Sequence, residues 1–567
     1  MSVLKTSQAT GSTGAVLEAR GSSRFLHIVN RLPAISTERL TILASLFFSL
    51  TSNYLFFSAA VAGRNWAQFD SWLFAGAIFV AITALQSAAL LFLLNRWTAK
   101  PVLTVLFLVT AAATYYMNKY TVFFDSDMVR NILRTDVKEA SELFSLSFCI
   151  HMLVFAVLPI LLLWKLRLKT TSWYRAIPVR LLYIIGALAV TAGSTMLVYQ
   201  DFSSLMRNQK EVRYLITPSN YLYSLVRVVV ADTAHANTPR VKISEDAKMA
   251  ATWGQRTKPM LFILVVGETT RAANWGLNGY EHQTTPELSK LDVMNFPHAT
   301  SCGTNTEVSV PCMFSIYGRR NYDEAKIRGH ESLLHIIDHV GVKTIWRDNQ
   351  AGCKGVCDGL EEQQLGNSKN PALCDGERCL DEIMLENMDG EIHKAKNGNL
   401  FIVMHQLGNH GPAYYRRYPA SMRTFTPTCD TSDLSKCSRE QIVNAYDNGV
   451  LYTDHFLAKT IAYLKTQTTY DTAMLYLSDH GESLGEHGIY LHGLPYSIAP
   501  KEQTQIPMVM WLSQGFANSF HLNKDCLAKR AANPVSQDNL FHSILGMLQI
   551  ESKYYDKSLD ISAECRS

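Results

Sequence analysis

The sequence predicts an integral membrane domain of five transmembrane α-helices, followed by an α/β domain outside the cytoplasm. Three observations support this fold class: five long apolar runs lie in the first 200 residues, apolar β-type runs alternate with helical segments from residue 259 onward, and ten of the eleven cysteines follow residue 300. Apolar residues make up 47% of the 567 residues and charged residues 18%. The net charge of +4 is too small to indicate binding to nucleic acid, so no such partner is expected.

Each apolar run approaches the roughly 20 residues that a helix needs to cross a bilayer. None of the five contains an Asp or Glu. The alternative, a soluble protein, would need five unusually long uncharged helices in succession, and a cleavable signal peptide would not be followed by four further runs. The predicted spans are Leu40–Ala62, Trp72–Leu94, Pro101–Met117, Phe148–Leu166 and Leu181–Tyr199.

The basic residues predict the orientation, because Lys and Arg are enriched in cytoplasmic loops. The loop after the first run has only Arg64, and the loop after the third run mixes both signs. The N-terminus is therefore expected in the cytoplasm, and an odd number of spans places the C-terminal part outside. The basic residues on the cytoplasmic side are Lys5, Arg20, Arg24, Arg31, Arg39, Arg96, Lys100, Lys165, Arg167, Lys169 and Arg175.

The cysteines support that placement independently. Cys149 lies in the fourth apolar run, and the other ten all lie in the part predicted to be outside. An even set on one side of a membrane suggests disulfides in an oxidising compartment. Sequence alone does not fix the pairing, and zinc bound by thiolates from either of two close pairs is the alternative. The close pairs are Cys302–Cys312, Cys353–Cys357, Cys374–Cys379 and Cys429–Cys437, which leaves Cys526–Cys565; the second and third are the candidates for zinc.

Four apolar β-type runs follow residue 259: "MLFILVVGETTR", "NLFIVMHQLGNHGP", "DTAMLYLSDHGES" and "IPMVMWLS". Continuous apolar runs with polar residues at the carboxyl end are typical of parallel strands that are buried on both sides. Ligands bind beyond those ends in open α/β sheets. Glu268, His410, Asp479 and His480 are therefore expected to converge on one rim.

Two carboxylates and an imidazole suit Zn²⁺ in a site with one open position. Each residue also has a purely structural explanation: Glu268 and Asp479 could cap helices, and His410 could be a turn residue before Gly411 and Pro412. Four such residues at the ends of successive predicted strands favour a functional site.

The segment "CGTNTEVSVPC" contains three hydroxyls: Thr304, Thr306 and Ser309. A hydroxyl in the open position of a metal loses its proton more readily and becomes a nucleophile. If a helix starts after Thr306, its free N–H groups would favour an anionic phosphoryl group there. A structural threonine in a stapled loop is the alternative, and spacing alone does not choose among the hydroxyls.

Five motifs match one known family in order and in spacing: "VVGETTRAANWGLNGY", "CGTNTEVSVPCMFS", "WRDNQAGCKGVCD", "GNHGPAYYRRYP" and "LSDHGESLGEHGIYLHGLPY". The chain resembles the phosphoethanolamine transferases that modify lipid A, a family that includes the mobile colistin resistance enzymes and belongs to the alkaline phosphatase and sulfatase superfamily. The resemblance covers nearly the whole chain.

The resemblance implies a division into four parts. These are a cytoplasmic N-terminal segment (1–39), a five-helix transmembrane domain (40–200), a periplasmic bridging or interfacial segment (201–258) and a periplasmic sulfatase-like catalytic domain (259–567). The tyrosines and the alternation of apolar and basic residues in the third part suit a segment on the membrane surface, and a plain linker with one helix fits as well.

The same resemblance implies the roles of individual residues. It places the nucleophile at Thr306. It assigns contacts with the donor lipid to Asn131, Thr135 and Glu139, whose spacing of four would put them on one helix face; a plain interfacial helix is the alternative. The implied zinc ligands are Glu268, Thr306, Asp479 and His480; the residues for a further zinc, for the substrate or for proton transfer are His410 and His492; the further substrate contacts are Lys354 and Gln350, where the colistin resistance enzymes often have Asn.

The implied activity is a zinc-dependent transfer of phosphoethanolamine from phosphatidylethanolamine to a lipid A phosphate, through a phosphoethanolamine-threonine intermediate. Such a protein would be a monomer in the bacterial inner membrane, in contact with its lipids, with one tightly bound Zn²⁺ and a second left open. The modification would lower the negative charge of the outer membrane and its susceptibility to polymyxin and colistin. The alternatives are a core-sugar or other envelope acceptor, a phosphoglycerol-transferring synthase, and a membrane sensor without activity.

Overall fold

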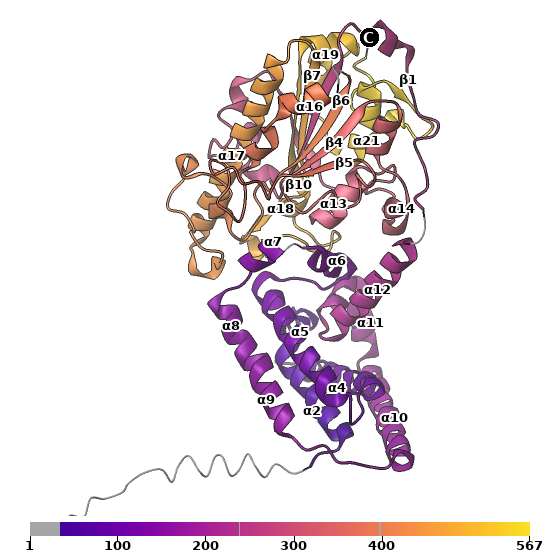
Figure 1. The fold of residues 1–567 in the computed structure, drawn as a ribbon. Helices are drawn as coiled ribbons and strands as arrows, with labels where there is room; N and C mark the ends of the chain where they lie inside the picture. The colour runs from indigo at the N-terminus through magenta and orange to yellow at the C-terminus, as the bar shows by residue number, and fades with distance from the viewer. Residues whose placement is uncertain (1–33, 136, 237–238, 396–397, 567) are drawn as a thin grey trace, which may run out of the picture. The chain divides into compact units, whose positions relative to one another are not determined.

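The computed structural model describes residues 34–135, 137–236, 239–395 and 398–566. Most of the predicted cytoplasmic segment therefore lies outside the described residues. The chain forms two compact units (Figure 1). The first comprises residues up to 52, 63–111 and 151–202, and the second comprises 53–62, 112–150 and 203 to the end.

The apolar runs form helices of spanning length. Among the described residues, four helical stretches are long and apolar enough to cross a membrane: α4 (Phe69–Leu93), α5 (Ala99–Tyr120), α8 to α9 (Leu146–Lys165) and α10 (Trp173–Leu197). Two further helices, α2 (Thr37–Ser52) and α3 (Tyr54–Ala60), make a fifth if the bent pair is one span. The prediction of helical spans is confirmed, with one difference in the first of them.

The first predicted span is bent by 66° between α2 and α3. The break falls at Asn53, whose side chain is buried and pairs with the backbone of Thr217 through two hydrogen bonds of 2.8 Å. An apolar run in the sequence indicates that a segment is buried, but it does not reveal a polar contact with a residue as far along the chain as Thr217. The sequence therefore did not predict the bend.

Shorter helices occupy the loop after α5 and the bridging segment. The loop contains α6 (Ser126–Arg134) and α7 (Val137–Glu142). The bridging segment holds α11 (Tyr199–Asn208), a 3₁₀ turn η2 (Lys210–Leu215) and α12 (Ser219–Ala236), which is more than the single helix of the linker alternative.

An eight-stranded sheet forms the centre of the second unit (Figure 1). Its strand order is β11-β3-β10-β7-β2-β6-β4-β5. The strands are β2 (Met260–Gly267), β3 (Met294–Thr300), β4 (Lys343–Asp348), β5 (Glu361–Gln364), β6 (Leu400–His405), β7 (Asp471–Ser478), β10 (Gln505–Leu512) and β11 (Val535–Ser536). Two small antiparallel pairs join β1 (Lys248–Met249) to β12 (Ile550–Glu551) and β8 (Ser483–Leu484) to β9 (Tyr490–Leu491).

Helices cover both faces of the sheet. Alternate residues of β2 point to opposite faces, and Phe262 and Ile263 accordingly belong to two separate apolar clusters. Residues of α13, α15 and α21 join the first cluster, and residues of α16 and α17 join the second. Burial on both sides explains why the whole of β2 is apolar. The helices of this part are α13 (Thr306–Met313), α14 (Glu324–Gly329), α15 (Leu333–His339), α16 (Met388–Lys394), α17 (Arg439–Thr466), α18 (Lys501–Thr504), α19 (Gln514–Ser519), α20 (Lys524–Ala531) and α21 (Asp538–Met547).

All four predicted strands are present, and the prediction that all are parallel is wrong for one. Strands β2, β6 and β7 are parallel, whereas β10 runs antiparallel to both β7 and β3. Continuous apolar character reports burial on two faces, and it carries no information on strand direction. The sequence also did not predict β5, "EEQQ", because an edge strand that is only half buried lacks the apolar run.

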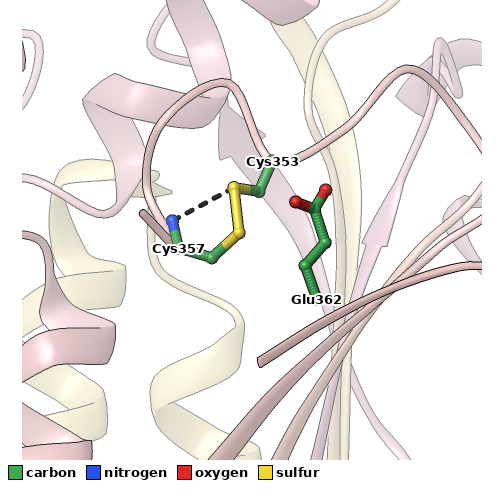
Figure 2. Close-up of side chains that lie close together, drawn as sticks. All are labelled: Cys353, Cys357 and Glu362. Atoms are coloured by element: carbon green, nitrogen blue, oxygen red, sulfur yellow. Dashed lines mark hydrogen bonds between the residues drawn. A yellow bond between two sulfur atoms is a disulfide. The ribbon is translucent and has the colours of Figure 1, made fainter. Parts of the chain in front are cut away.

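The four predicted close pairs and the remaining pair, Cys526–Cys565, all form disulfides, with Cα–Cα distances from 4.0 to 6.1 Å, and Cys149 is free. The alternative of zinc bound by thiolates is wrong, because both candidate pairs are oxidised. Figure 2 shows Cys353 joined to Cys357 beside Glu362, so the sulfurs are not available as thiolate ligands.

The Cys302–Cys312 bridge should stabilise the second unit by restricting the unfolded chain. Replacing both cysteines by serine is expected to lower the free energy of unfolding by about 2–3 kcal/mol, because the bridge closes a short loop. Guanidinium unfolding followed by tryptophan fluorescence measures this, with Cys149→Ser as the matched control. Non-reducing peptide mapping that finds free thiols at two or more of the ten bridged cysteines would contradict the pairing.

Candidate active site

The pairing of β2 with β7 brings two carboxylates together. The two strands are parallel, with Gly267 opposite Ser478, so the residues that follow, Glu268 and Asp479, leave the sheet side by side. His480 comes next, and one ligand atom from each of the three lies within 4.8 Å of the others. All three are fully buried. The predicted convergence of these three residues at the strand ends is thus present.

The histidine of this cluster is held in one tautomer. Its Nδ1 lies 2.9 Å from the carbonyl oxygen of Gly481, so Nδ1 carries the proton and donates it there. Nε2 then faces the carboxylates, 3.4 Å from Glu268 Oε1 and 3.3 Å from Asp479 Oδ2, where it can hold either a proton or a metal ion. A carbonyl behind an imidazole whose other nitrogen is free is the usual arrangement around a metal-binding histidine.

Thr306 is the one of the three candidate hydroxyls that contacts this cluster. Its Oγ1 lies 3.1 and 3.3 Å from the oxygens of Glu268 and 3.4 Å from His480 Nε2. It is the first residue of α13, which Asn305 caps by accepting a hydrogen bond from Val308. The Thr304 hydroxyl instead donates to the carbonyl of Leu494.

The charges of the cluster favour a bound cation. Burial raises the pKa of Asp479 to about 7, with the charge of Glu268 as the next cause. Burial lowers the pKa of His480, but the two carboxylates outweigh it and raise it to about 10. Asp479 Oδ2 is buried and has no hydrogen-bond donor in the described part of the chain. Two carboxylates, an imidazole and a hydroxyl fit a divalent cation such as Zn²⁺, whose binding would displace protons.

Two further histidines continue the site. The ring centroid of His492 lies 4.5 Å from that of His480 and 5.4 Å from that of His410. Each has a carboxylate partner: His492 Nδ1 lies 3.2 Å from Glu482, and His410 Nε2 lies 2.6 Å from Glu139. The sequence did not identify Glu482, although it stands in the "SDHGES" motif two residues after His480.

The His410–Glu139 pair is buried and charged. Burial lowers the pKa of His410, but Glu139 outweighs it and raises that pKa to about 9. Burial in turn raises the pKa of Glu139, which His410 lowers to about 2. The Nδ1 of His410 is buried without a hydrogen-bond partner among the described residues. Glu139 is therefore connected to the rim of the sheet by its contact with His410. The position of Glu139 in the sequence did not predict this contact.

The other expected substrate contacts are divided between two places. Gln350 and Glu139 line a cavity of about 460 Å³, together with Arg134 and Lys138. Lys354 lines a separate small cleft, and its ammonium donates to the carbonyl of Ala351.

The expectation that Asn131, Thr135 and Glu139 share one helix face is wrong. Helix α6 ends at Arg134, Thr135 is extended, and α7 begins at Val137. The Thr135 hydroxyl donates to the carbonyl of Asn131, which satisfies a carbonyl near the end of α6.

The fold and the site define a membrane-anchored α/β enzyme of the sulfatase class, with a threonine hydroxyl against a carboxylate and histidine cluster. Residues 261–550 match the sulfatase family, and residues 82–233 match the family "Phosphoethanolamine transferase EptA/EptB". The phosphoethanolamine transferase EptA of Escherichia coli K12 is 37% identical over 94% of this chain and 98% of its own length. This chain belongs to the phosphoethanolamine transferase family.

Two further similarities agree. The integral membrane lipooligosaccharide phosphoethanolamine transferase A of Neisseria meningitidis superposes with a TM-score of 0.89, at 37% identity, over 94% of this chain and all of that one. Phosphatidylethanolamine transferase Mcr-1 of Escherichia coli is 38% identical over 77% of this chain and 81% of its own length. The predicted family and fold class are confirmed.

Removing the carboxylate of Glu139 should make His410 less basic. In Glu139→Gln the pKa of His410 is expected to fall well below about 9, because burial and Arg417 lower it and only the more distant charge of Glu268 still raises it. NMR titration of the full-length protein labelled at histidine Cε1 measures this. His542, whose pKa burial lowers to about 4, serves as an internal control. A pKa of His410 that stays near 9 would contradict the pairing.

Proposed function

We propose that this transferase moves phosphoethanolamine from phosphatidylethanolamine to a phosphate of lipid A, with Thr306 as the covalent carrier. The observation that carries the proposal is the position of Thr306 Oγ1, 3.1 Å from Glu268 and 3.4 Å from His480. The donor is suggested by the similarity to Mcr-1, which is named a phosphatidylethanolamine transferase. That the acceptor contains lipid A is suggested by the Kdo(2)-lipid A phosphoethanolamine 7''-transferase of Escherichia coli, which is 26% identical over 560 residues; the choice of a phosphate rather than a sugar hydroxyl on it is our proposal.

Glu268, Asp479, His480 and the Thr306 oxygen are the residues that would hold one Zn²⁺. A bound zinc would lower the pKa of the Thr306 hydroxyl and offset the negative charge on the phosphoryl oxygens. The orphaned oxygen of Asp479 supports this assignment. His410 and His492 are the residues near which a second zinc would bind.

The transfer would proceed in two steps. Thr306 gives its hydroxyl proton to Glu268, its Oγ forms a bond to the phosphorus of phosphatidylethanolamine, and the bond between phosphorus and the glycerol oxygen breaks. The departing oxygen takes a proton, and diacylglycerol is released. A phosphate oxygen of lipid A then bonds to the same phosphorus, the bond to Thr306 breaks, and the Thr306 oxygen takes its proton back from Glu268.

His410 is the proton donor that we propose for the first step. Its pKa of about 9 keeps it an imidazolium at neutral pH. Its Nε2 proton is engaged by Glu139, whereas its Nδ1 has no partner among the described residues. The Nδ1 proton can therefore be given to the leaving oxygen. His492, 11% exposed and backed by Glu482, is the alternative donor.

We also propose how the substrates and the chain are arranged. The cavity of about 460 Å³ beside Gln350 and Glu139 would take the donor head group, and Asn131 and Thr135 would contact the donor lipid. Lys354 would contact the phosphoryl group. The protein would be a monomer of the inner membrane with residues 1–39 in the cytoplasm, the spans in 40–200, and both the bridging segment 201–258 and the catalytic domain 259–567 in the periplasm. Polymyxin susceptibility would fall on expression.

Thr306 should be the hydroxyl that carries the adduct. After incubation with phosphatidylethanolamine and no acceptor, peptide mass spectrometry is expected to find phosphoethanolamine on Thr306. Thr306→Ala should abolish both diacylglycerol release and acceptor modification, and Thr304→Ala should keep the adduct. Lipid A mass spectrometry of cells with and without expression identifies the acceptor. An adduct on Thr304 or Ser309, or turnover by Thr306→Ala, would show that another hydroxyl acts.

The carboxylate and histidine cluster should hold the zinc. Asp479→Asn and His480→Ala are expected to retain less than roughly a tenth of the zinc after dialysis, since the loss of a ligand exceeds the 10- to 100-fold effect of an outer partner. Metal analysis by mass spectrometry measures this. His487→Ala is the matched control, because this exposed histidine is close in sequence and is not a member of the cluster. Full activity after extensive chelation would refute a catalytic zinc.

A further inference from the structure

Six charged side chains beside the nucleophile form a closed ring in which positive and negative charges alternate. Three are arginines and three are carboxylates, so the ring has no net charge. The contacts run Arg134–Asp232 (3.1 Å), Asp232–Arg130 (3.3 Å), Arg130–Glu324, Glu324–Arg328 (3.1 Å), Arg328–Glu307 (2.8 Å) and Glu307–Arg134 (2.5 Å). Every member thus has two partners of opposite charge.

The ring joins four helices that pack against one another (Figure 1). Arg130 and Arg134 stand one turn apart on α6, and Glu324 and Arg328 stand one turn apart on α14. Asp232 comes from α12 and Glu307 from α13. Glu307 directly follows Thr306, so the ring connects α6 to the start of the helix that carries the nucleophile.

The ring is buried where it meets that helix. The side chain of Glu307 is 1% exposed, and that of Arg328 is 12% exposed. Arg328 also donates to the backbone carbonyl of Glu307, 2.9 Å away. A buried carboxylate next to Thr306 would repel an incoming phosphoryl group if it were unpaired, and the two arginines neutralise it. Arg134 lies on the exposed side, and it also lines the cavity that holds Gln350 and Glu139.

We propose that this ring positions α6, and with it one wall of the donor cavity, against the start of the nucleophile helix. Arg134 and Glu307 are then positioning residues for the donor step: they fix where a lipid bound along α6 presents its phosphorus to Thr306. This inference rests on the proposed function. It assigns the ring no part in the second step, because the acceptor reacts with a group already attached to Thr306.

The closed ring makes a prediction that an isolated ion pair does not. Neutralising Arg134 or Glu307 alone leaves the ring with a net charge and an unbalanced neighbour. Neutralising both leaves four charges that still alternate. Exchanging the two charges is worse than either single change, because the reversed charge at 134 then faces Asp232 and that at 307 faces Arg328. An isolated pair would instead be restored by the exchange.

The test uses the full-length protein in lipid nanodiscs and follows the Thr306 adduct at varied phosphatidylethanolamine concentration without acceptor. Arg134→Gln and Glu307→Gln are each expected to raise the donor KM about tenfold. The double variant, which carries both of these substitutions, should raise it less, and the exchanged variant, Arg134→Glu with Glu307→Arg, should raise it more than either single substitution. Reaction of the preformed adduct with lipid A should be unchanged in all of them. Arg134→Lys should recover part of the effect, because it keeps the charge and loses the two-pronged geometry.

A matched control is Arg320→Gln, which breaks the exposed pair of Arg320 with Asp556 (3.2 Å) elsewhere on the same unit. Equal KM values in all variants, or full rescue by the exchange, would overturn the inference. If the unaltered protein forms no adduct, the proposed function fails. Amide hydrogen exchange then tests separately whether the ring positions α6. The amide hydrogen exchange rate of residues 126–134 should rise in each single variant and return toward the original rate in the double variant. An unchanged hydrogen exchange rate in the single variants would overturn the inference.

Discussion

Two buried carboxylates, Glu268 and Asp479, stand side by side at the ends of adjacent parallel strands, and the rest of the site follows from the positive charge that they require. Bringing two carboxylates out of water is costly unless a cation or protons compensate. No Lys or Arg pairs with either of them in the described part of the chain; the compensating side chain is His480. The register of β2 with β7 creates this demand before any substrate is present. The Thr306 hydroxyl lies beside the same cluster, so a cation that binds to the two carboxylates would also lower the pKa of this hydroxyl.

Charge compensation continues outward from that cluster in layers. The next layer consists of imidazole and carboxylate pairs, and beyond it lie ion pairs of arginine. Glu139 and Glu142 of the short helix α7 supply two of these carboxylates: Glu139 holds His410, and Glu142 holds Arg417, which donates to the backbone carbonyl of His410. Residues 112–150 accordingly belong to the same compact unit as the sheet. The sulfatase-like region by itself would leave the His410 imidazole without its carboxylate partner.

The sequence predicted those features that are local or that follow from burial. Apolar runs reveal spans and buried strands, and polar residues at the ends of such strands reveal Glu268, Asp479 and His480. Among the hydroxyls, the residues alone left three candidates, and the resemblance to a family chose Thr306. The direction of β10, the bend at Asn53 and the partner of Glu139 depend on contacts between residues far apart in the chain. Nothing in the local pattern carries that information, and the interruption of the helix at Thr135 shows that a spacing of four does not establish a continuous helix.

Helix α6 has two faces of different character, and ion pairs together with two buried apolar side chains fix one of them within the unit. Arg130 and Arg134 point to the ring, whereas Ile132 and Leu133 are 49% and 58% exposed. The same helix also buries Met128 and Val129, each 7% exposed, so part of its packing within the unit is apolar. The charge pairs add specific partners to this packing, and the exposed Ile132 and Leu133 are left for a lipid surface. The interfacial helix and the donor-contacting helix, which the sequence presented as alternatives, are therefore compatible descriptions of α6.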